Sequence, residues 1–437
     1  MNQPETLTAA AAARHIARGE LAATELLEAC LDRIRERDGE VAAWAHVDEA
    51  GARATARKCD DEARAGSLRG PLHGVPVGVK DVIDVAGMTT TAGAAAFAHT
   101  EPTEDATCVA RLRAAGAVIV GKTTTTELAY FEPSPTRNPC NPAHTPGGSS
   151  SGSAAAVGAR MVPVALGTQT IGSVLRPAAY CGVVGFKGTH GLVPGDGVVQ
   201  LAALSLDHVG VLARSVEDVG LVFGLLADAP VEQIEPRAPR IAVARELLER
   251  AEADVAERVW AAAERLGDAG ATVTEITLPQ SFAAIHDAGQ AVLAGEFATF
   301  QSALYRAHAD EYRPRTRGLI EEGLAQHTHE YVRAQQARAR FRAEIVPLLE
   351  DAGALLTPSA AGTAPAGLDF TGDPWFCAPW SSIGAPAISL PNGIGADSLP
   401  HAIQLVRPTG SDGELLGLAG WCERVLDREG GLVREGA

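Results

Sequence analysis

The sequence predicts an α/β fold, a single domain with a mixed central β-sheet covered by helices on both faces. Short apolar runs bounded by glycine, such as 75–79 and 117–120, are typical of strands buried on both sides of a sheet. Stretches with helical periodicity alternate with such runs, and no repeat or clean linker divides the chain. We therefore expect one domain over residues 1–437.

The expected elements fall into three consecutive parts. Residues 1–68 form an N-terminal helical segment, with helical periodicity over 7–38, broken near Gly19, and again over 48–66. The core of the domain, residues 72–230, is rich in small residues and contains expected helices at 104–115 and 215–227.

The last part, residues 231–437, is expected to return to the same sheet, because strand and helix patterns alternate there again. Its expected strands are 240–244, 272–279, 354–358, 386–391 and 401–406. Its expected helices are 252–268, 281–307, 328–350 and 413–427.

Composition excludes several classes of protein. The net charge of −17 argues against direct binding of nucleic acid, which needs clustered cations. No stretch of 18 apolar residues is present to span a membrane, and the charged N-terminus is not a signal peptide. The seven cysteines are scattered without a C-x-x-C pair, as in a reduced, cytoplasmic protein without a metal framework.

Three motifs suggest a chemistry that their context does not support. Residues 116–123 match the Walker A pattern, but its variable positions read AVIV, which favours a strand over a phosphate-binding loop. Residues 148–152 match the G-x-S-x-G nucleophile elbow, yet five prolines in the preceding stretch 132–148 exclude the buried strand that an elbow follows. His327 and His329, two residues apart, fit the solvated start of a helix better than a metal site.

A different set of residues offers a serine together with a lysine base. Lys80 ends the apolar strand of GVPVGVKD (74–81), and the loop GGSSSGS (147–153) concentrates hydroxyl groups. Ser173 lies in GTQTIGSVLRPA (167–178), just before a helical run. Only four of the 37 basic residues are lysines, so a lysine here marks a place where arginine does not serve.

These stretches resemble the amidase signature family of Ser–cisSer–Lys amide hydrolases. The family pattern is G-V-P-x-x-x-K-D, then G-G-S-S-G-G-S, then G-[ST]-D-x-G-G-S-[IV]-R-x-P-[AS]. The bridging serine of the family lies 24 residues before the nucleophile, which from Ser173 leads to Ser149. The close resemblance covers about 72–230, and APAISLP (385–391) fits a late strand of the family.

The resemblance implies a role for each residue. Ser173 is the expected nucleophile, and Ser149, after a cis peptide bond, passes its proton to Lys80. The backbone N–H groups of an oxyanion hole are expected from four consecutive residues: Thr170, Ile171, Gly172 and Ser173. No cofactor and no metal is implied.

Three departures of the chain from the family bear on the site and its surroundings. Gln169 replaces the usual Asp, Ile171 stands where glycine is common, and Gly188 replaces a common proline. We expect Ile171 to narrow the substrate pocket or displace the oxyanion hole.

The substrate pocket is less well defined by the sequence. Its candidate residues are Tyr130, Phe131, Gln169, Arg176, Gln200, Trp375, Phe376 and Trp380. The aromatic members fit the protein core equally well. Arg176 is interpreted as structural, with contact to an acidic substrate as the alternative, whereas Lys122 and Lys187 are interpreted as structural.

The resemblance leads to a cytoplasmic amidase that hydrolyses a small or medium carboxamide to a carboxylate and ammonia or an amine. Its expected partner is the small-molecule amide, without nucleic acid or membrane, and a homodimer is left open. The alternative is the catalytic A subunit of a tRNA-dependent amidotransferase, which works only together with a partner protein. The third reading is a catalytically inactive relative used for binding.

Overall fold

The computed structural model describes residues 3–97, 100–395 and 398–427. One mixed sheet of 11 strands runs through it, in the order β1-β3-β2-β4-β6-β5-β10-β11-β9-β7-β8. The strands are β1 (Trp44–Val47), β2 (Pro76–Lys80), β3 (Val118–Thr123), β4 (Val164–Gln169), β5 (Val184–Lys187), β6 (His208–Ala213), β7 (Arg240–Ala244), β8 (Thr272–Ile276), β9 (Leu355–Pro358), β10 (Ala387–Ile394) and β11 (Pro400–Val406).

The helices are distributed along the whole chain. They are α1 (Ala9–Ala17), α2 (Ala23–Val41), α3 (Glu49–Arg64), α4 (Thr107–Ala114), α5 (Ser151–Gly158), α6 (Leu175–Cys181), α7 (Val216–Leu226), α8 (Arg245–Leu248), α9 (Ala253–Asp268), α10 (Ile285–His308), α11 (Pro314–Ala325), α12 (Thr328–Ala352), α13 (Ala378–Ser382) and α14 (Asp412–Asp427). Among the described helices, none combines the length and the apolar character needed to cross a membrane.

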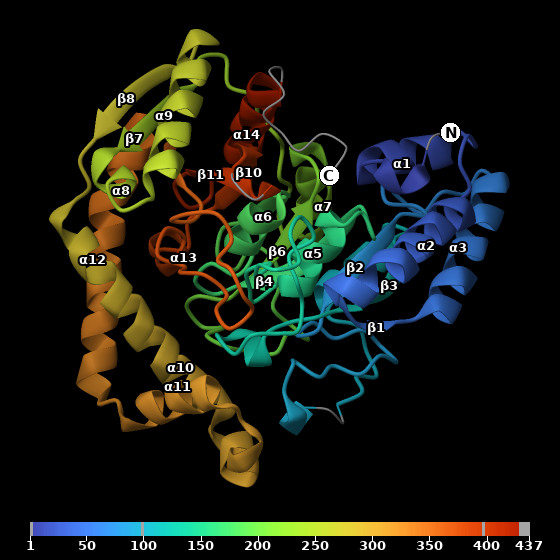
Figure 1. Cartoon of the computed structure of the whole chain (residues 1–437), viewed down its shortest axis with the longest axis horizontal. Helices are drawn as coiled ribbons and strands as arrows, with labels where there is room; N and C mark the ends of the chain where they lie inside the picture. The colour runs from blue at the N-terminus through green and yellow to red at the C-terminus, as the bar shows by residue number, and fades with distance from the viewer. Residues whose placement is uncertain (1–2, 98–99, 396–397, 428–437) are drawn as a thin grey trace.

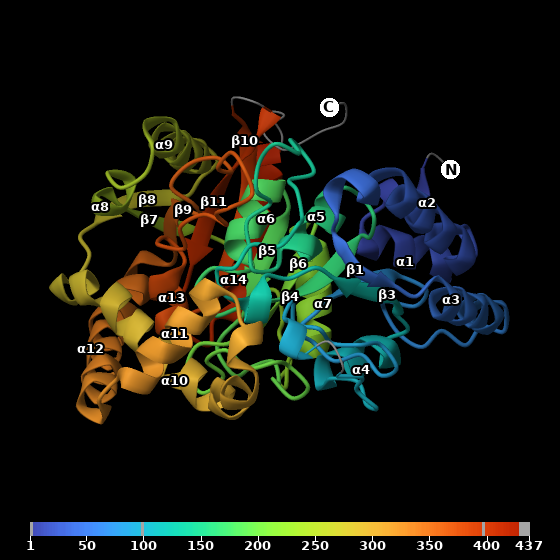
Figure 2. The same cartoon turned by 60° about the horizontal axis from the view of Figure 1, so that its bottom comes forward.

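Helices cover both faces of the sheet, as the sequence predicts. Along β4, Val164 and Leu166 belong to one hydrophobic core and Ala165 to the other, because alternate side chains of a strand point to opposite faces. The first core includes residues of α4, α7, α9 and α14, and the second includes residues of α1, α2, α3 and α5. Figures 1 and 2 show α1–α3 at one end of the molecule and α10–α12 at the other, with α5 and α6 between them.

The strand pairing in the middle of the sheet fixes the place of the site. β2 pairs in parallel with both β3 and β4, so the carboxyl ends of these three strands lie at the same edge. β4 pairs antiparallel with β6, which brings the start of β6 beside the end of β4. The segments that follow β2 and β4 and that precede β6 therefore meet.

The Walker A match is part of a strand. Residues 118–123 form β3, and Lys122 is fully buried in an ion pair with Asp81 (2.9 Å). A Cβ atom on Gly121 would lie 2.1 Å from the His46 carbonyl oxygen, so glycine is needed there for the close approach of β1. The predicted solvated helix start at His327 is also observed, since His327 and Glu330 form a capping box at the start of α12.

Several elements were not expected from the sequence, among them β1 and α11. β1 is a short edge strand of four residues whose side chains are half-buried or exposed, so it lacks the apolar run of a buried strand. α11 contains Gly318 and Gly323, and each glycine in a helix costs about 1 kcal/mol relative to alanine. Its N-terminus at Pro314 and its packing against α10 offset that weak propensity.

The glycine at position 188 follows from packing rather than from backbone freedom. A Cβ atom there would lie 2.2 Å from Cζ of Phe223 and 2.9 Å from Oδ1 of Asp412. The Phe223 ring is buried against Phe186, with ring centroids 4.7 Å apart, and has no room to move aside. The proline common in the family would meet the same ring.

We expect Gly188→Ala to lower the free energy of unfolding by about 1–3 kcal/mol, the usual cost of overpacking a core. Chemical denaturation measures this loss. The matched control is Gly224→Ala, at an exposed position of α7 where a Cβ atom would meet nothing within 4 Å. This control should be neutral or stabilising by up to about 1 kcal/mol. Equal stability of the two variants would contradict the clash with Phe223.

Candidate active site

The structure brings Lys80, Ser149 and Ser173 to one place. Lys80 is the last residue of β2, Ser149 precedes α5, and Ser173 lies in the turn between β4 and α6. Ser149 and Ser173 line the same small cavity. A hydrogen bond from the Ser150 N–H to the Ser173 carbonyl oxygen (3.2 Å) joins the two loops that carry them.

The Lys80 amine is fully buried and surrounded by hydroxyl groups. Nζ donates to Oγ of Ser149 (2.7 Å) and to Oγ1 of Thr168 (2.8 Å). Burial lowers the pKa of Lys80 well below that of an ordinary lysine, although the negative charge of Asp207 acts in the opposite direction. Within the described residues Lys80 forms no ion pair, so its neutral form is favoured, and a neutral amine is a base.

The serine-rich loop is held by its own hydroxyl groups. The peptide bond between Gly148 and Ser149 is cis, as the resemblance implies. Ser150 Oγ donates to the Thr168 carbonyl oxygen (3.2 Å), and Ser153 Oγ donates to that of Leu166 (2.8 Å). Ser150, the residue that matches the nucleophile elbow, therefore binds the loop to β4.

Glycine is required in this loop where other backbone comes close. A Cβ atom on Gly152 would lie 2.2 Å from the Ala43 carbonyl oxygen. Gly147 has φ of 81°, and a Cβ atom on it would lie 2.9 Å from Cα of Pro177. The density of serine and glycine thus follows from tight packing of the loop against β4, the segment before β1 and α6.

The turn that carries Ser173 has free backbone donors. In the described part of the chain, no acceptor is found for the N–H groups of residues 170–173. The next N–H groups, those of Val174 and Leu175, donate to Oε1 of Gln169 (2.9 and 3.0 Å). Four unpaired N–H groups next to a serine hydroxyl form the arrangement that an oxyanion hole needs.

The cavity at Ser173 is narrow, and its empty space, counted out into open solvent, is about 250 Å³. Three of the pocket candidates, Tyr130, Phe131 and Arg176, line this cavity, and so does Ile171. Arg176 is also structural, since Nη2 donates to the Gly148 carbonyl oxygen (2.7 Å) and Nε to that of Thr371 (2.8 Å). Nη1 of this buried side chain has no partner among the described residues.

The remaining pocket candidates lie elsewhere. Gln169 is buried and holds the start of α6, with Nε2 donating to Ser381 Oγ (3.0 Å). Trp380 and Phe376 are buried in a separate core with α12, and the Trp375 ring stacks on that of His286. Gln200 lines a neighbouring cavity. An aromatic side chain gains similar free energy from burial whether it lines the substrate cavity or packs in the core. The sequence therefore does not distinguish these two positions.

Three features of the site were missed by the sequence reasoning. Thr168, whose hydroxyl group accepts a hydrogen bond from the Lys80 amine, lies inside the third motif. A hydroxyl-bearing residue at that place in the motif could have been noticed in the sequence. Asp207, which accepts from Thr170 Oγ1 (2.7 Å), offered no such signal. The family pattern also places arginine two residues after the nucleophile, where this chain has Leu175, and Arg176 follows one position later.

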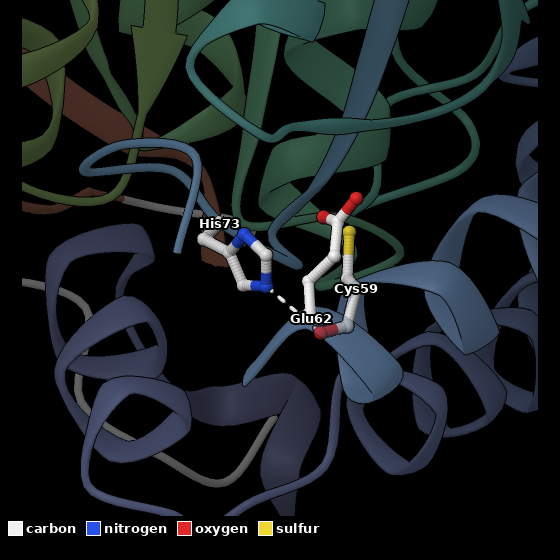
Figure 3. A group of neighbouring side chains, drawn as sticks. All are labelled: Cys59, Glu62 and His73. Atoms are coloured by element: carbon white, nitrogen blue, oxygen red, sulfur yellow. Dashed lines mark hydrogen bonds between the residues drawn. The ribbon is translucent and has the colours of Figure 1, made fainter. Parts of the chain in front are cut away.

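One trio of potential metal ligands occurs in the described residues, away from this cavity. The ligand atoms of Cys59, Glu62 and His73 lie within 4.8 Å of one another (Figure 3). His73 Nε2 is hydrogen-bonded to the Cys59 carbonyl oxygen (2.9 Å), and its Nδ1 accepts from the Arg69 N–H (3.1 Å). Glu62 forms two hydrogen bonds with Arg69 (2.6 and 2.8 Å). Because His73 and Glu62 are already engaged, the trio is a structural cluster.

Comparison with known proteins agrees with this geometry. The Amidase family model matches residues 25–416 of the chain. The A subunit of the glutamyl-tRNA(Gln) amidotransferase of Roseiflexus castenholzii is 36% identical in an alignment 476 positions long, which covers 96% of each protein.

Solved structures show the same likeness. A crystal structure of an amidase superposes with a TM-score of 0.90 at 32% identity, over 96% of this chain and 100% of that one. The peptide amidase of Stenotrophomonas maltophilia has a TM-score of 0.85 at 31% identity, over 96% of this chain and 97% of that one. The chain belongs to the Amidase family, and it is an enzyme of the amide hydrolase class.

We expect Lys80→Arg to be almost as inactive as Lys80→Ala in amide hydrolysis. Arginine keeps the charge and much of the reach, but its guanidinium stays protonated and accepts no proton. The measurement is kcat/KM of the three proteins, with circular dichroism to verify folding. If Lys80→Arg keeps more than about a tenth of the wild-type kcat/KM, the loss of transition-state stabilisation is below about 1.4 kcal/mol. That result would mean that Lys80 acts as a fixed charge.

The wild-type rate should depend on pH through the same amine. The base is the neutral form, so kcat/KM should rise with pH and then reach a plateau. Because burial lowers the pKa of Lys80, the plateau should begin well below about pH 10.4, where an ordinary lysine loses its proton. A rate that still increases near pH 10 would contradict the shift.

Proposed function

We propose that this protein is an amidase that hydrolyses a small or medium carboxamide through an acyl-enzyme on Ser173. The observation that carries the proposal is the 2.7 Å contact between the buried Lys80 amine and Ser149 Oγ, in the cavity that Ser173 also lines. A buried amine with a lowered pKa next to a hydroxyl relay is how a lysine activates a serine.

The chemistry proceeds in two steps. Ser173 Oγ attacks the amide carbonyl carbon, its proton passes to Ser149 Oγ, and the Ser149 proton passes to Lys80 Nζ. The N–H groups of residues 170–173 stabilise the oxyanion of the tetrahedral intermediate, to which each such donor contributes about 3 kcal/mol. The C–N bond then breaks, and its electron pair stays on nitrogen, which takes a proton from Ser149 as Lys80 returns one. Water, activated by the same relay, cleaves the ester to release the carboxylate.

The cavity indicates which acyl groups fit. Ile171 takes up space that glycine would leave open, so the acyl group next to the scissile carbonyl is small or slender. The partnerless Nη1 of Arg176 lies in a side chain that lines the same cavity, and it suits an oxygen acceptor on the acyl group. These features support a polar, compact acyl group.

The catalytic component of a tRNA-dependent amidotransferase is the second candidate, favoured by the 36% identity to the protein from Roseiflexus castenholzii. The two functions differ in what the isolated chain does. An amidase hydrolyses simple amides alone, whereas the amidotransferase component needs its partner. Turnover of primary amides by the purified chain would support the amidase, and activity that appears only with partner proteins would support the alternative.

We expect Ser173→Ala to abolish amide hydrolysis and leave the fold intact, because only the nucleophilic oxygen is removed. A fluorophosphonate should label Ser173 in the wild-type protein, and peptide mass spectrometry should locate the adduct. Ser150→Ala is the matched control in the neighbouring loop, and it should still be labelled. An adduct on Ser150 in the wild-type protein would contradict the assignment.

We expect Ile171→Gly to widen the range of acyl groups accepted while Ser173 remains competent. The change removes a side chain that lines the cavity and restores the residue common in the family. The measurement is kcat/KM for a series of primary amides with increasing branching beside the carbonyl. Ile171→Val, which removes one methyl group, should give an intermediate profile. An unchanged profile in both variants would mean that Ile171 does not limit the acyl group.

A further inference from the structure

The carboxylate of Asp207 contacts the turn that carries the nucleophile. β4 and β6 pair antiparallel with Gln169 opposite His208, so the residue after Gln169 and the residue before His208 meet just beyond the paired strands. These two residues are Thr170 and Asp207, and Thr170 Oγ1 donates to Asp207 Oδ1 at 2.7 Å. The strand register therefore brings a carboxylate to the first residue of the proposed oxyanion hole.

The other oxygen of the same carboxylate holds a wall of the cavity. Asp207 Oδ2 accepts from the N–H groups of Leu201 and Ala202 (both 2.9 Å). Leu201 lines the cavity at Ser173 together with Thr170. All three partners of Asp207 donate, and an ionised carboxylate is the form that only accepts hydrogen bonds. One charged side chain thus joins two segments that surround the nucleophile.

We propose that Asp207 is a positioning residue of the amidase reaction, which fixes Thr170 and the Leu201 wall around the oxyanion and supplies a negative charge that balances Lys80 when Lys80 takes up a proton. This inference rests on the proposed amidase function. Asp207 makes and breaks no bond of the substrate, and it acts through Thr170 and Lys80.

The contact with Thr170 controls the direction of backbone donors. The Thr170 N–H is the first of the four unpaired N–H groups in the turn, and such donors act well only when they are already aimed at the place where charge develops. Gln169 Oε1 holds the far end of the turn by accepting from the N–H groups of Val174 and Leu175. The turn is therefore held at its start by Asp207 and at its end by Gln169.

The charge of Asp207 serves the second requirement of the base. Lys80 has to be neutral at rest and has to hold a proton during the reaction. Its direct contacts are hydroxyl groups, which favour the neutral form, and the charge of Asp207 raises the pKa of Lys80 against the larger effect of burial. A carboxylate beyond direct contact stabilises the ammonium as it forms. Asp81, next to Lys80 in the chain, is itself paired with Lys122 (2.9 Å).

The other titratable groups around Asp207 do not duplicate its charge. His190 and His208 line the same neighbouring cavity as Asp207, and burial lowers the pKa of both imidazoles, so they are neutral at pH 7 and above. Burial raises the pKa of Asp207, as does the charge of Glu296, whereas the three hydrogen bonds that Asp207 accepts lower it.

The test separates the contact from the charge with three variants. Asp207→Ala removes both, and Thr170→Val removes only the contact, since the Thr170 N–H stays. Asp207→Asn removes only the charge, because its amide oxygen can accept from the two N–H groups of the wall and its amide N–H can donate to Thr170 Oγ1. The control is Asp196→Asn, which removes an exposed carboxylate from the same segment between β5 and β6.

We expect Asp207→Ala and Thr170→Val to lower kcat for a primary amide by about tenfold or more and to change KM by less than about threefold, because the oxyanion forms only after binding. If Asp207→Ala fails to fold by circular dichroism, Thr170→Val decides the positioning role. Asp196→Asn should change neither constant.

The pH profile reports the charge. The rise of kcat/KM with pH should move to lower pH by about 0.5 pH unit or more in Asp207→Asn, because loss of the negative charge lowers the pKa of Lys80 further. Thr170→Val and Asp196→Asn should leave the position of this rise unchanged.

The outcomes distinguish this inference from the proposed function. Turnover by the wild-type protein with an unchanged kcat in Asp207→Ala and Thr170→Val overturns the positioning role and leaves the amidase function in place. A pH profile that Asp207→Asn does not move, or that Asp196→Asn moves equally, overturns the role of the charge. Absence of turnover of primary amides by the wild-type protein overturns the amidase function, and the role of Asp207 with it.

Discussion

The burial of one amine is the constraint around which the site is arranged. Lys80 ends a fully buried strand, and its Nζ finds hydroxyl oxygens instead of a carboxylate. A charged amine in such surroundings loses most of its hydration, so the neutral base is favoured. This outcome depends on β2 pairing in parallel with β4, because the parallel register puts the end of β2 beside Thr168 and the serine-rich loop.

The same need to pair buried polar groups explains the loop itself. Its hydroxyl groups donate hydrogen bonds to carbonyl oxygens of β4. Its glycines leave room for the backbone of the segment before β1 and of α6 to approach closely. Arg176 completes the frame by binding the carbonyl oxygen of Gly148, the residue before the cis bond. Most serines of this loop have a structural role, because their hydroxyl groups bind backbone carbonyl oxygens. Ser149 of the loop and Ser173 line the cavity.

The rarity of lysine proves informative in the structure. Three of the four lysines, at positions 80, 122 and 187, are fully buried. Lys122 pairs with Asp81, whereas Lys187 donates to the carbonyl oxygens of Gly188 and Ala385, and burial lowers its pKa to about 7. Of these three lysines, only Lys80 forms a hydrogen bond with a serine that lines the cavity, Ser149.

The sequence by itself predicted the α/β fold class and most of the long helices, because apolar periodicity is a local property of the chain. Three short motifs and their spacing, through the family resemblance, named Lys80, Ser149 and Ser173 as the candidate relay. Only the tertiary structure decided which side chains face the cavity. It placed Gln169 and Trp380 in the core, brought Asp207 to Thr170 from the far end of a loop, and explained Gly188 by the ring of Phe223. Each of these depends on contacts between segments distant in sequence, and an apolar or amide side chain carries no local signal that distinguishes one buried environment from another.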